Sequence, residues 1–325
     1  MKNIIYNSHF MLKVFRKLMY RSGNCYTNEF VEYFDQEAND YVKNRIVEAF
    51  NNRSGLMISK FGTIELNNVC CAIRGSEPIN KELFFSAAKG EGIIYLDECF
   101  QGLCTNAGFF PDDIDLVDKY KDLVLADCKE IDILGSYLKQ EKYLAKELAK
   151  TVRVNLEGYY APFCWNNPWT GAMKGKRVLV VHPFKNSIEQ QYLKREKLFE
   201  NREVLPEFKS LSIIKAVQSV SGNETRFKDW FDALEYMKEE IDKTDYDIAL
   251  IGCGAYGMDL AAHVKRKGKV AVHLAGWTQM LFGIYGNRWI QDQPKFKRFI
   301  NESWVRPLDS EKPQNAEKIE QGCYW

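Results

Sequence analysis

The chain has 325 residues, of which 46% are hydrophobic and 27% charged, so it can bury a large core as one big α/β domain or two smaller ones. Its 45 Lys and Arg side chains balance 44 Asp and Glu, and this net charge of +1 gives no general electrostatic reason to bind nucleic acid. No apolar run approaches the roughly 20 residues that cross a bilayer, and no signal peptide is visible. Nine cysteines without a C-x-x-C pair fit a reducing cytoplasm, which is where we expect the protein.

Residues 11–21 alternate apolar and basic side chains and predict a short amphipathic helix, within an N-terminal helical extension over residues 1–37. Two roles are open for this helix. It could dock its apolar side on the core, which we favour because the segment is short. It could also lie on an anionic membrane surface, as a peripheral contact at the inner face of the membrane.

The rest of the chain alternates strand and helix patterns. Helices are expected at 38–50, 63–75, 111–127, 141–150, 227–241 and 258–267, with a further one after a turn at 182–186 that has capping-box spacing at Ser187. Strands are expected at 56–61, 93–96, 152–156, 178–181, 248–251 and 269–274. This alternation predicts an α/β fold with a mostly parallel, Rossmann-like sheet and helices on both faces. We assign residues 38–300 to this domain and residues 301–325 to a C-terminal tail.

A glycine-rich turn follows the apolar run 248–251. It has the pattern G-x-G-x-x-G over residues 252–257 and opens a helix. Glycines there let the backbone approach a ligand, and the start of a helix favours an anion such as a phosphate. A nicotinamide-binding unit would also carry an acid near the end of the next strand, and no acidic residue lies between Lys269 and Ile290. We therefore expect a nucleotide but no NAD.

Two other strand ends carry polar residues, and ligands of such sheets sit at the carboxyl ends of strands. Glu65, in the stretch Phe-Gly-Thr-Ile-Glu, could hold a divalent metal or a sugar hydroxyl. The alternative, which we weight more heavily, is an acid in the first turn of a helix, stabilised by the helix dipole. His182 could act as a base or donate to a phosphate, and Lys185 could pair with a phosphate; a capped helix start with an incidental histidine is equally open.

The stretch from Ile58 to Leu66 resembles the basic-Phe-Gly-Asp-x-Glu motif of the GT-D type glycosyltransferases, and residues 252–276 resemble their C-terminal block. The middle block, from 176 to 219, is similar to bacterial polysaccharide-cluster proteins of that superfamily. The resemblance covers about residues 38–290. In that family a D-x-E motif binds the metal and the diphosphate of a nucleotide sugar. Glu65 matches its acidic end, but Thr63 stands at the Asp position, and a hydroxyl is a far poorer ligand for Mg²⁺ or Mn²⁺.

The resemblance implies an enzyme that moves a sugar from a nucleotide-sugar donor to a growing surface glycan or glycoprotein glycan, free or lipid-linked. Glu65 and His182 are then the candidate catalytic residues, and Glu65 would be the ligand of any Mn²⁺ or Mg²⁺. The helix starts after residues 182 and 252 would hold the donor diphosphate. The candidate donor-binding residues are Phe61, Gly62, Thr63, Lys185, Gly252, Gly254, Tyr256, Gly257, Gly276 and Gln279. The alternatives are a sugar-nucleotide-binding protein without turnover and an NAD(P)-dependent sugar oxidoreductase or epimerase.

Overall fold

The computed structural model describes residues 25–74, 96–223 and 225–325, together with the isolated positions 11, 14, 81 and 85. The predicted amphipathic helix and the predicted strand at 93–96 therefore lie outside the described residues, except for single positions. One of these, Leu96, begins a helix instead of ending a strand. In the part of the chain that is described, no helix is both long and apolar enough to cross a bilayer.

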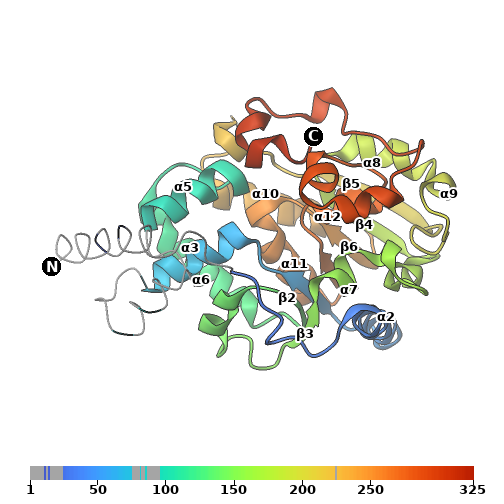
Figure 1. Ribbon diagram of the computed structural model, residues 1–325, viewed down its shortest axis with the longest axis horizontal. Helices are drawn as coiled ribbons and strands as arrows, with labels where there is room; N and C mark the ends of the chain where they lie inside the picture. Colours follow the sequence, from blue (N-terminus) through green and yellow to red (C-terminus); the bar gives the residue numbers. More distant parts are fainter. Residues whose placement is uncertain are drawn as a thin grey trace.

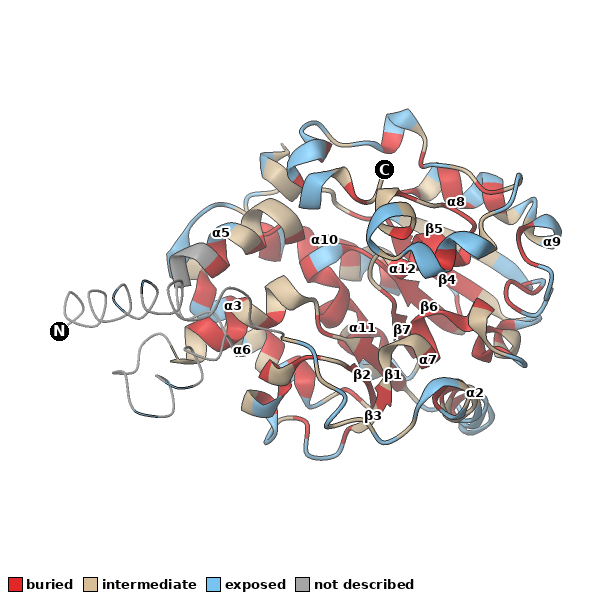
Figure 2. Cartoon of the chain, viewed as in Figure 1, coloured by how far each residue is buried: buried red, intermediate tan, exposed pale blue. Residues whose placement is uncertain are grey.

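Seven parallel strands form one sheet in the order β3-β2-β1-β7-β6-β4-β5 (Figure 1). The strands are β1 (Leu56–Lys60), β2 (Ile133–Ser136), β3 (Val152–Asn155), β4 (Arg177–His182), β5 (Ser210–Lys215), β6 (Ile248–Ile251) and β7 (Val270–His273). The central strands are buried on both faces (Figure 2), which explains their nearly unbroken apolar sequences. The expected α/β fold with a parallel sheet is confirmed.

Helices cover both faces of the sheet. In the described part of the chain, the α-helices of at least five residues are α2 (Asp35–Asn52), α3 (Thr63–Arg74), α5 (Leu96–Ala107), α6 (Val117–Cys128), α7 (Leu156–Tyr160), α8 (Lys185–Tyr192), α10 (Trp230–Asp242), α11 (Gly257–Arg266) and α12 (Trp277–Leu281). Successive side chains of a strand point to opposite faces. Leu179 and Val181 accordingly pack in one core with α3, α6, α10 and α11, whereas Val178 and Val180 pack in another with α2, α7, α8 and α12.

The connections after the central strands leave the sheet in opposite directions. Strands β1 and β6 lead into α3 and α11 on one face, whereas β7 and β4 lead into α12 and α8 on the other. Adjacent strands whose connections diverge in this way leave a crevice at their carboxyl ends, where ligands of such sheets bind. The topology therefore fixes the place of a site before any side chain is considered.

Several elements differ from the prediction. Strands β2 and β5 and helices α5, α7 and α12 were not expected from the sequence. The helix expected at 141–150 is a short 3₁₀ turn, Lys139–Leu144, followed by further turns. Glu141 lies in the first turn of this element, and its buried carboxylate accepts the backbone N–H groups of Tyr137 and Leu138, both at 2.9 Å, as in a capping box.

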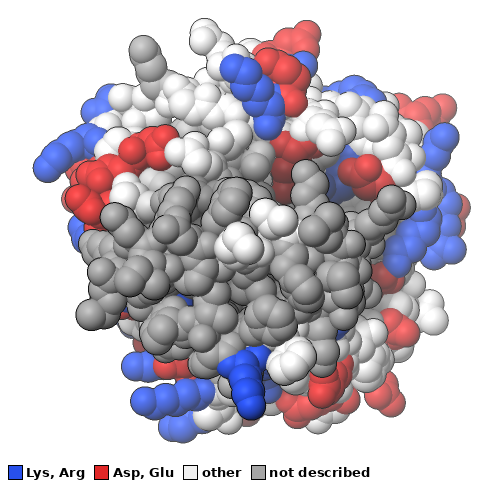
Figure 3. Space-filling model, turned by 60° about the vertical axis from the view of Figure 1, so that its left-hand side comes forward, with Lys and Arg blue, Asp and Glu red and all other residues white. Residues whose placement is uncertain are grey.

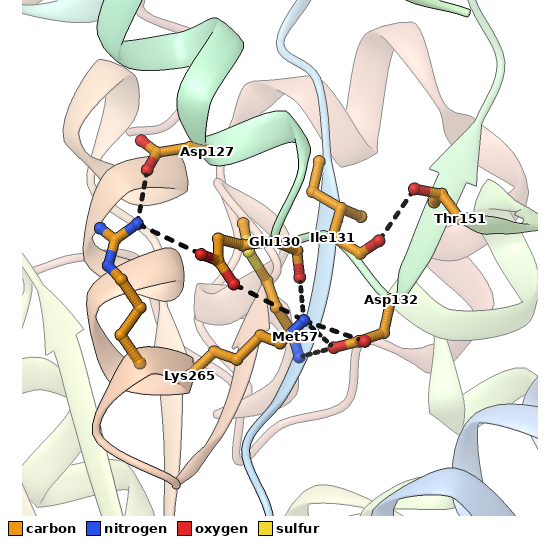
Figure 4. A network of polar contacts seen from close by, with 8 residues as sticks. Met57, Asp127, Glu130, Ile131, Asp132, Thr151 and Lys265 are labelled. Atoms are coloured by element: carbon orange, nitrogen blue, oxygen red, sulfur yellow. Dashed lines mark hydrogen bonds and ion pairs between the residues drawn. The ribbon is translucent and has the colours of Figure 1, made fainter. Parts of the chain in front are cut away.

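A polar network ties the opposite, amino edge of the sheet together (Figure 4). The Lys265 ammonium of α11 donates to the Asp132 carboxylate at 2.9 Å and to the Glu130 carbonyl at 2.6 Å. The same carboxylate accepts the Met57 N–H of β1 at 2.8 Å. Because the Asp132 carboxylate has partners within the protein and lies at the amino ends of the strands, its role is structural.

Charged side chains on the described part of the surface are mixed in sign. On the face shown in Figure 3, Lys and Arg are interspersed with Asp and Glu, in keeping with the net charge of +1. The pair of Lys243 with Glu240, one helical turn apart at 2.8 Å, lies at the surface, where solvent screens it and it adds little to stability.

Candidate functional site

A cavity of about 420 Å³ opens at the carboxyl edge of the sheet. This volume lies within the range of about 300–1,000 Å³ typical of small-molecule sites. The connection after each of the seven strands contributes to its wall. The lining residues are Lys60 and Gly62–Glu65 after β1, Tyr137 after β2, Leu156 and Tyr160 after β3, His182–Phe184 after β4, Val217–Val220 after β5, Gly252–Gly254 after β6, and Ala275–Trp277 with Gln279 after β7. The cavity therefore occupies the crevice that the topology creates.

The last residues of the chain form a further wall of the cavity. Ile319, Glu320, Tyr324 and Trp325 all line it, although residues 301–325 were expected to be a tail outside the domain. Gln279 of α12 fixes this segment, because its side-chain amide donates to the Tyr324 carbonyl at 3.2 Å.

Most of the predicted site residues meet in this cavity. Those that line it are Gly62, Thr63, Glu65, His182, Gly252, Gly254, Tyr256, Gly276 and Gln279. They come from four connections that are far apart in the sequence. Phe61, Lys185 and Gly257 do not line it.

Each of these three exceptions has a physical reason. Phe61 is a buried core side chain, and its carbonyl accepts the Tyr137 hydroxyl at 2.8 Å. Gly257 allows α11 to approach β7, since an added Cβ would lie 2.3 Å from Nε2 of His273. The ammonium of Lys185 lies 3.9 Å from the Glu189 carboxylate, one helical turn along α8. The donor-binding role predicted for these residues is not supported.

The N-terminus of α8, expected to hold a phosphate, is already occupied by a carboxylate of the protein. Glu311 is buried, and it accepts the backbone N–H groups of Asn186 at 2.6 Å and Ser187 at 3.2 Å, together with the Ser187 hydroxyl at 2.5 Å. Ser187 therefore lies inside the helix and is not its N-cap. The structure does not support a diphosphate at this helix start, because Glu311 supplies the negative charge that the helix dipole favours.

The side chain of Glu65 folds back over Gly62 at the start of α3. A Cβ added to Gly62 would lie only 1.8 Å from Oε2 of Glu65, so the carboxylate position depends on glycine there. Burial raises the pKa of Glu65, and the nearby Lys60 ammonium opposes this shift. A raised pKa brings a carboxyl group closer to the range useful for proton transfer near neutral pH.

His182 is a neutral hydrogen-bond donor. Its Nδ1 accepts the Phe184 N–H at 3.0 Å, so the single proton of the neutral ring is on Nε2. Burial lowers the pKa of His182 to about 3. With no lone pair on Nε2, the ring can donate to a phosphate oxygen but cannot serve as the base at neutral pH. The base role considered for His182 is therefore disfavoured, and Glu65 is the better placed of the two candidates.

The glycines of the 252–257 turn are required by packing around the cavity. An added Cβ on Gly252 would lie 2.4 Å from the Ala275 carbonyl, so glycine brings the ends of β6 and β7 together. Gly254 has a φ of +60°, and its Cβ would lie 2.7 Å from the Ala107 carbonyl. Tyr256 lines the cavity, and its hydroxyl lies 2.9 Å from the hydroxyl of Ser219, another lining residue.

Five charged side chains from the described part of the chain line the cavity, and the sequence pattern had indicated only one of them, Glu65. The cations are Lys60 and Arg288, and the acids are Glu65, Asp292 and Glu320. Among the described residues, no group of three or more His, Cys, Asp or Glu is arranged to hold a metal ion. Of the four charges other than Glu65, only Lys60 had a sequence signal, since it immediately precedes the Phe-Gly motif. The other three unexpected charges, on Arg288, Asp292 and Glu320, come from segments without a recognisable pattern.

Comparison with known proteins gives little further information. No protein-family model matches the chain, and no curated protein matches it. A solved structure described as the selenomethionine-substituted domain of unknown function 1792 is similar, with 12% sequence identity and a TM-score of 0.37. The alignment covers 96% of this chain and 98% of the other. A likeness this weak carries no argument for function, and the sheet itself establishes the fold class.

Proposed function

We propose that the protein is a glycosyltransferase that moves a sugar from a nucleotide-sugar donor to a growing surface glycan or glycoprotein glycan, free or lipid-linked. The observation that carries the proposal is that the Glu65 motif and the glycine turn line one cavity at the carboxyl edge of the sheet. These are the two sequence blocks that resemble GT-D type glycosyltransferases. In this proposal the protein works in the cytoplasm, with residues 11–21 available as a peripheral contact to the inner face of the membrane.

The reaction needs a base for the acceptor hydroxyl and stabilisation of the leaving diphosphate. Glu65 takes the acceptor proton as the acceptor oxygen bonds to the anomeric carbon of the sugar. The bond from that carbon to the phosphate oxygen breaks, and the diphosphate leaves with its electron pair. His182 donates from Nε2 to a phosphate oxygen. The residues that the structure describes do not make a metal centre, Thr63 stands where the GT-D motif has Asp, and no step of the proposal uses a metal.

Binding is tested first, by thermal unfolding with a panel of nucleotide sugars, nucleoside diphosphates and NAD(P), each with and without Mn²⁺. A ligand present at a hundredfold its dissociation constant stabilises the folded state by about 2.7 kcal/mol, which is readily measured. Stabilisation by a nucleotide sugar is expected. A preference for NAD(P) over every nucleotide sugar would replace the transferase with the oxidoreductase or epimerase.

Turnover is tested next with the matched donor and acceptor. Glu65→Gln keeps the shape of the side chain and removes its basicity, so sugar transfer should fall by about a hundredfold or more. Glu235→Gln on α10 is the matched control, because Glu235 is exposed and pairs only with Lys238 within its helix. Donor binding with no transfer in the wild type would favour the second candidate, a sugar-nucleotide-binding protein, which the loss of the family's Asp at Thr63 already suggests.

A further inference from the structure

The cavity has few groups with which to bind an anion. The start of α8 is filled by Glu311, and Lys185 lies outside the lining. Among the described residues that line the cavity, the cations are Lys60 and Arg288. A phosphate in the cavity would therefore find its positive charge on these two side chains, and the Nε2–H of His182 is one of the neutral donors beside them.

Arg288 is held in position by the segment near the chain end. Its backbone N–H donates to the Cys323 carbonyl at 2.8 Å, and its guanidinium lies 4.5 Å from the centre of the Tyr324 ring. The guanidinium also forms an ion pair with the Glu320 carboxylate, which accepts the Cys323 thiol at 3.4 Å as well. A preorganised guanidinium at a cavity wall is well suited to recognise a planar or tetrahedral oxyanion.

The backbone that carries Glu320 is strained. Glu320 and Gln321 have φ values of 45° and 60°, in the left-handed region that residues with a Cβ disfavour. Another contact holding this residue is its N–H donating to the Asn106 side chain at 3.1 Å. The carboxylate on Arg288 is thus presented by a segment that would lose strain if it were released.

We propose that Arg288 binds the diphosphate of the donor, and that Glu320 is a resident carboxylate which the diphosphate displaces. This inference rests on the proposed function. Carboxylate and phosphate oxygens compete for the same fork of guanidinium N–H groups, and the phosphate brings more charge. Lys60 lies within electrostatic range of Arg288 and contributes a second cation, partly offset by Glu65. Asp292, the remaining acid, is exposed at the rim.

The test measures binding of inorganic pyrophosphate, without metal, by calorimetry to the full chain. Arg288→Met should weaken binding by about tenfold or more, the scale of losing a charge-assisted pair. Glu320→Gln should strengthen it severalfold, because it keeps the shape of the side chain and removes the competing charge. Arg306→Met is the matched control; this exposed arginine donates to Asn287 at 2.9 Å and does not line the cavity, so affinity should stay within about twofold.

The opposite signs of the two effects separate ligand binding from a purely structural ion pair. If Glu320→Gln weakens binding as Arg288→Met does, or if Arg288→Met leaves it unchanged, the inference is overturned. It is also overturned if neither the wild type nor Glu320→Gln binds pyrophosphate. Should Arg288→Met fail to fold, Arg288→Lys keeps the charge without the fork and should still weaken binding.

Nucleotide sugars, titrated in the same way, distinguish this inference from the proposed function. If they bind but Arg288→Met does not affect them, the inference fails while the proposed function stands. If pyrophosphate binds through Arg288 and no nucleotide sugar binds, the anion site stands while the proposed function fails.

Discussion

The buried imidazole of His182 makes the stability of the fold depend on pH in a way that can be calculated. Burial lowers its pKa to about 3 in the folded protein, against about 6.5 in an unfolded chain. Because the folded value is the lower one, the unfolded chain takes up the proton first as the pH falls. The stability contributed by the neutral ring is therefore fully present above about pH 6.5 and is lost progressively as the pH falls toward 3.

Between about pH 6.5 and pH 5, a span of about 1.5 pH units, the unfolded chain is protonated at this residue and the folded protein is not. Each of these pH units lowers the free energy of unfolding by about 1.4 kcal/mol. Between pH 8 and pH 5, His182 should therefore cost the folded state about 2 kcal/mol. His182→Gln removes this titration. The wild type should lose about 2 kcal/mol more of its unfolding free energy over this range than the variant does.

The measurement is urea unfolding of both proteins at pH 8 and pH 5. Comparing the two proteins cancels groups that titrate in the opposite sense, such as Glu65, whose raised pKa makes the folded state take up a proton on acidification. His273, whose pKa burial also lowers to about 3, should give the same difference in a His273→Gln variant. Equal losses in wild type and His182→Gln would show that His182 titrates normally and would restore it as a candidate base.

Three further predictions concern the glycines and the acid motif. Gly62→Ala should reduce sugar transfer by about tenfold or more with little loss of stability, because the added Cβ displaces the flexible end of Glu65; unchanged transfer would contradict this use of the motif. Gly257→Ala should instead lower stability and leave the site intact. The added Cβ contacts the His273 ring, so denaturant unfolding should show a loss of about 1–3 kcal/mol, whereas thermal-shift measurements on the folded protein should show unchanged donor affinity. Thr63→Asp restores two carboxylates and should strengthen the dependence of donor binding on Mn²⁺, a change that titration with and without Mn²⁺ would detect.

Sequence patterns located the central part of the sheet because its strands are buried on both faces. Strands β4, β6 and β7 are continuous apolar runs, and each is followed by a turn that reaches the cavity. Strand β2 gave no such signal, since its apolar run ends at Gly135, where an added Cβ would lie 2.2 Å from the Tyr159 ring. Strand β5 lies at the sheet edge and its side chains are mostly half-exposed, and its apolar residues do not form a continuous run because Ser212 interrupts them.

The site was predictable only as far as strand ends determine it. Glu65 and His182 follow directly from that rule, because parallel strands present their carboxyl ends at one edge. Arg288 and Glu320 could not be found in this way, since they reach the cavity through irregular segments whose path depends on contacts with the rest of the fold. Such contacts also explain why Lys185 was wrongly expected in the site. Glu311 occupies the helix start beside it, and no sequence pattern indicated that contact.

The glycines of the 252–257 turn are weaker evidence for a nucleotide than their sequence pattern indicated. Its sequence predicted glycines that let a phosphate approach the backbone. Each of the three glycines is instead required by a close protein contact, with Ala275, Ala107 and His273 respectively. A glycine-to-valine change in this turn would therefore disturb packing whether or not a nucleotide binds there. The case for a donor site consequently depends on the position of the turn at the cavity, beside the Glu65 motif, and on the polar groups that line it, and not on the glycines themselves. Variants of Glu65 and Arg288 therefore test it more directly than variants of the turn.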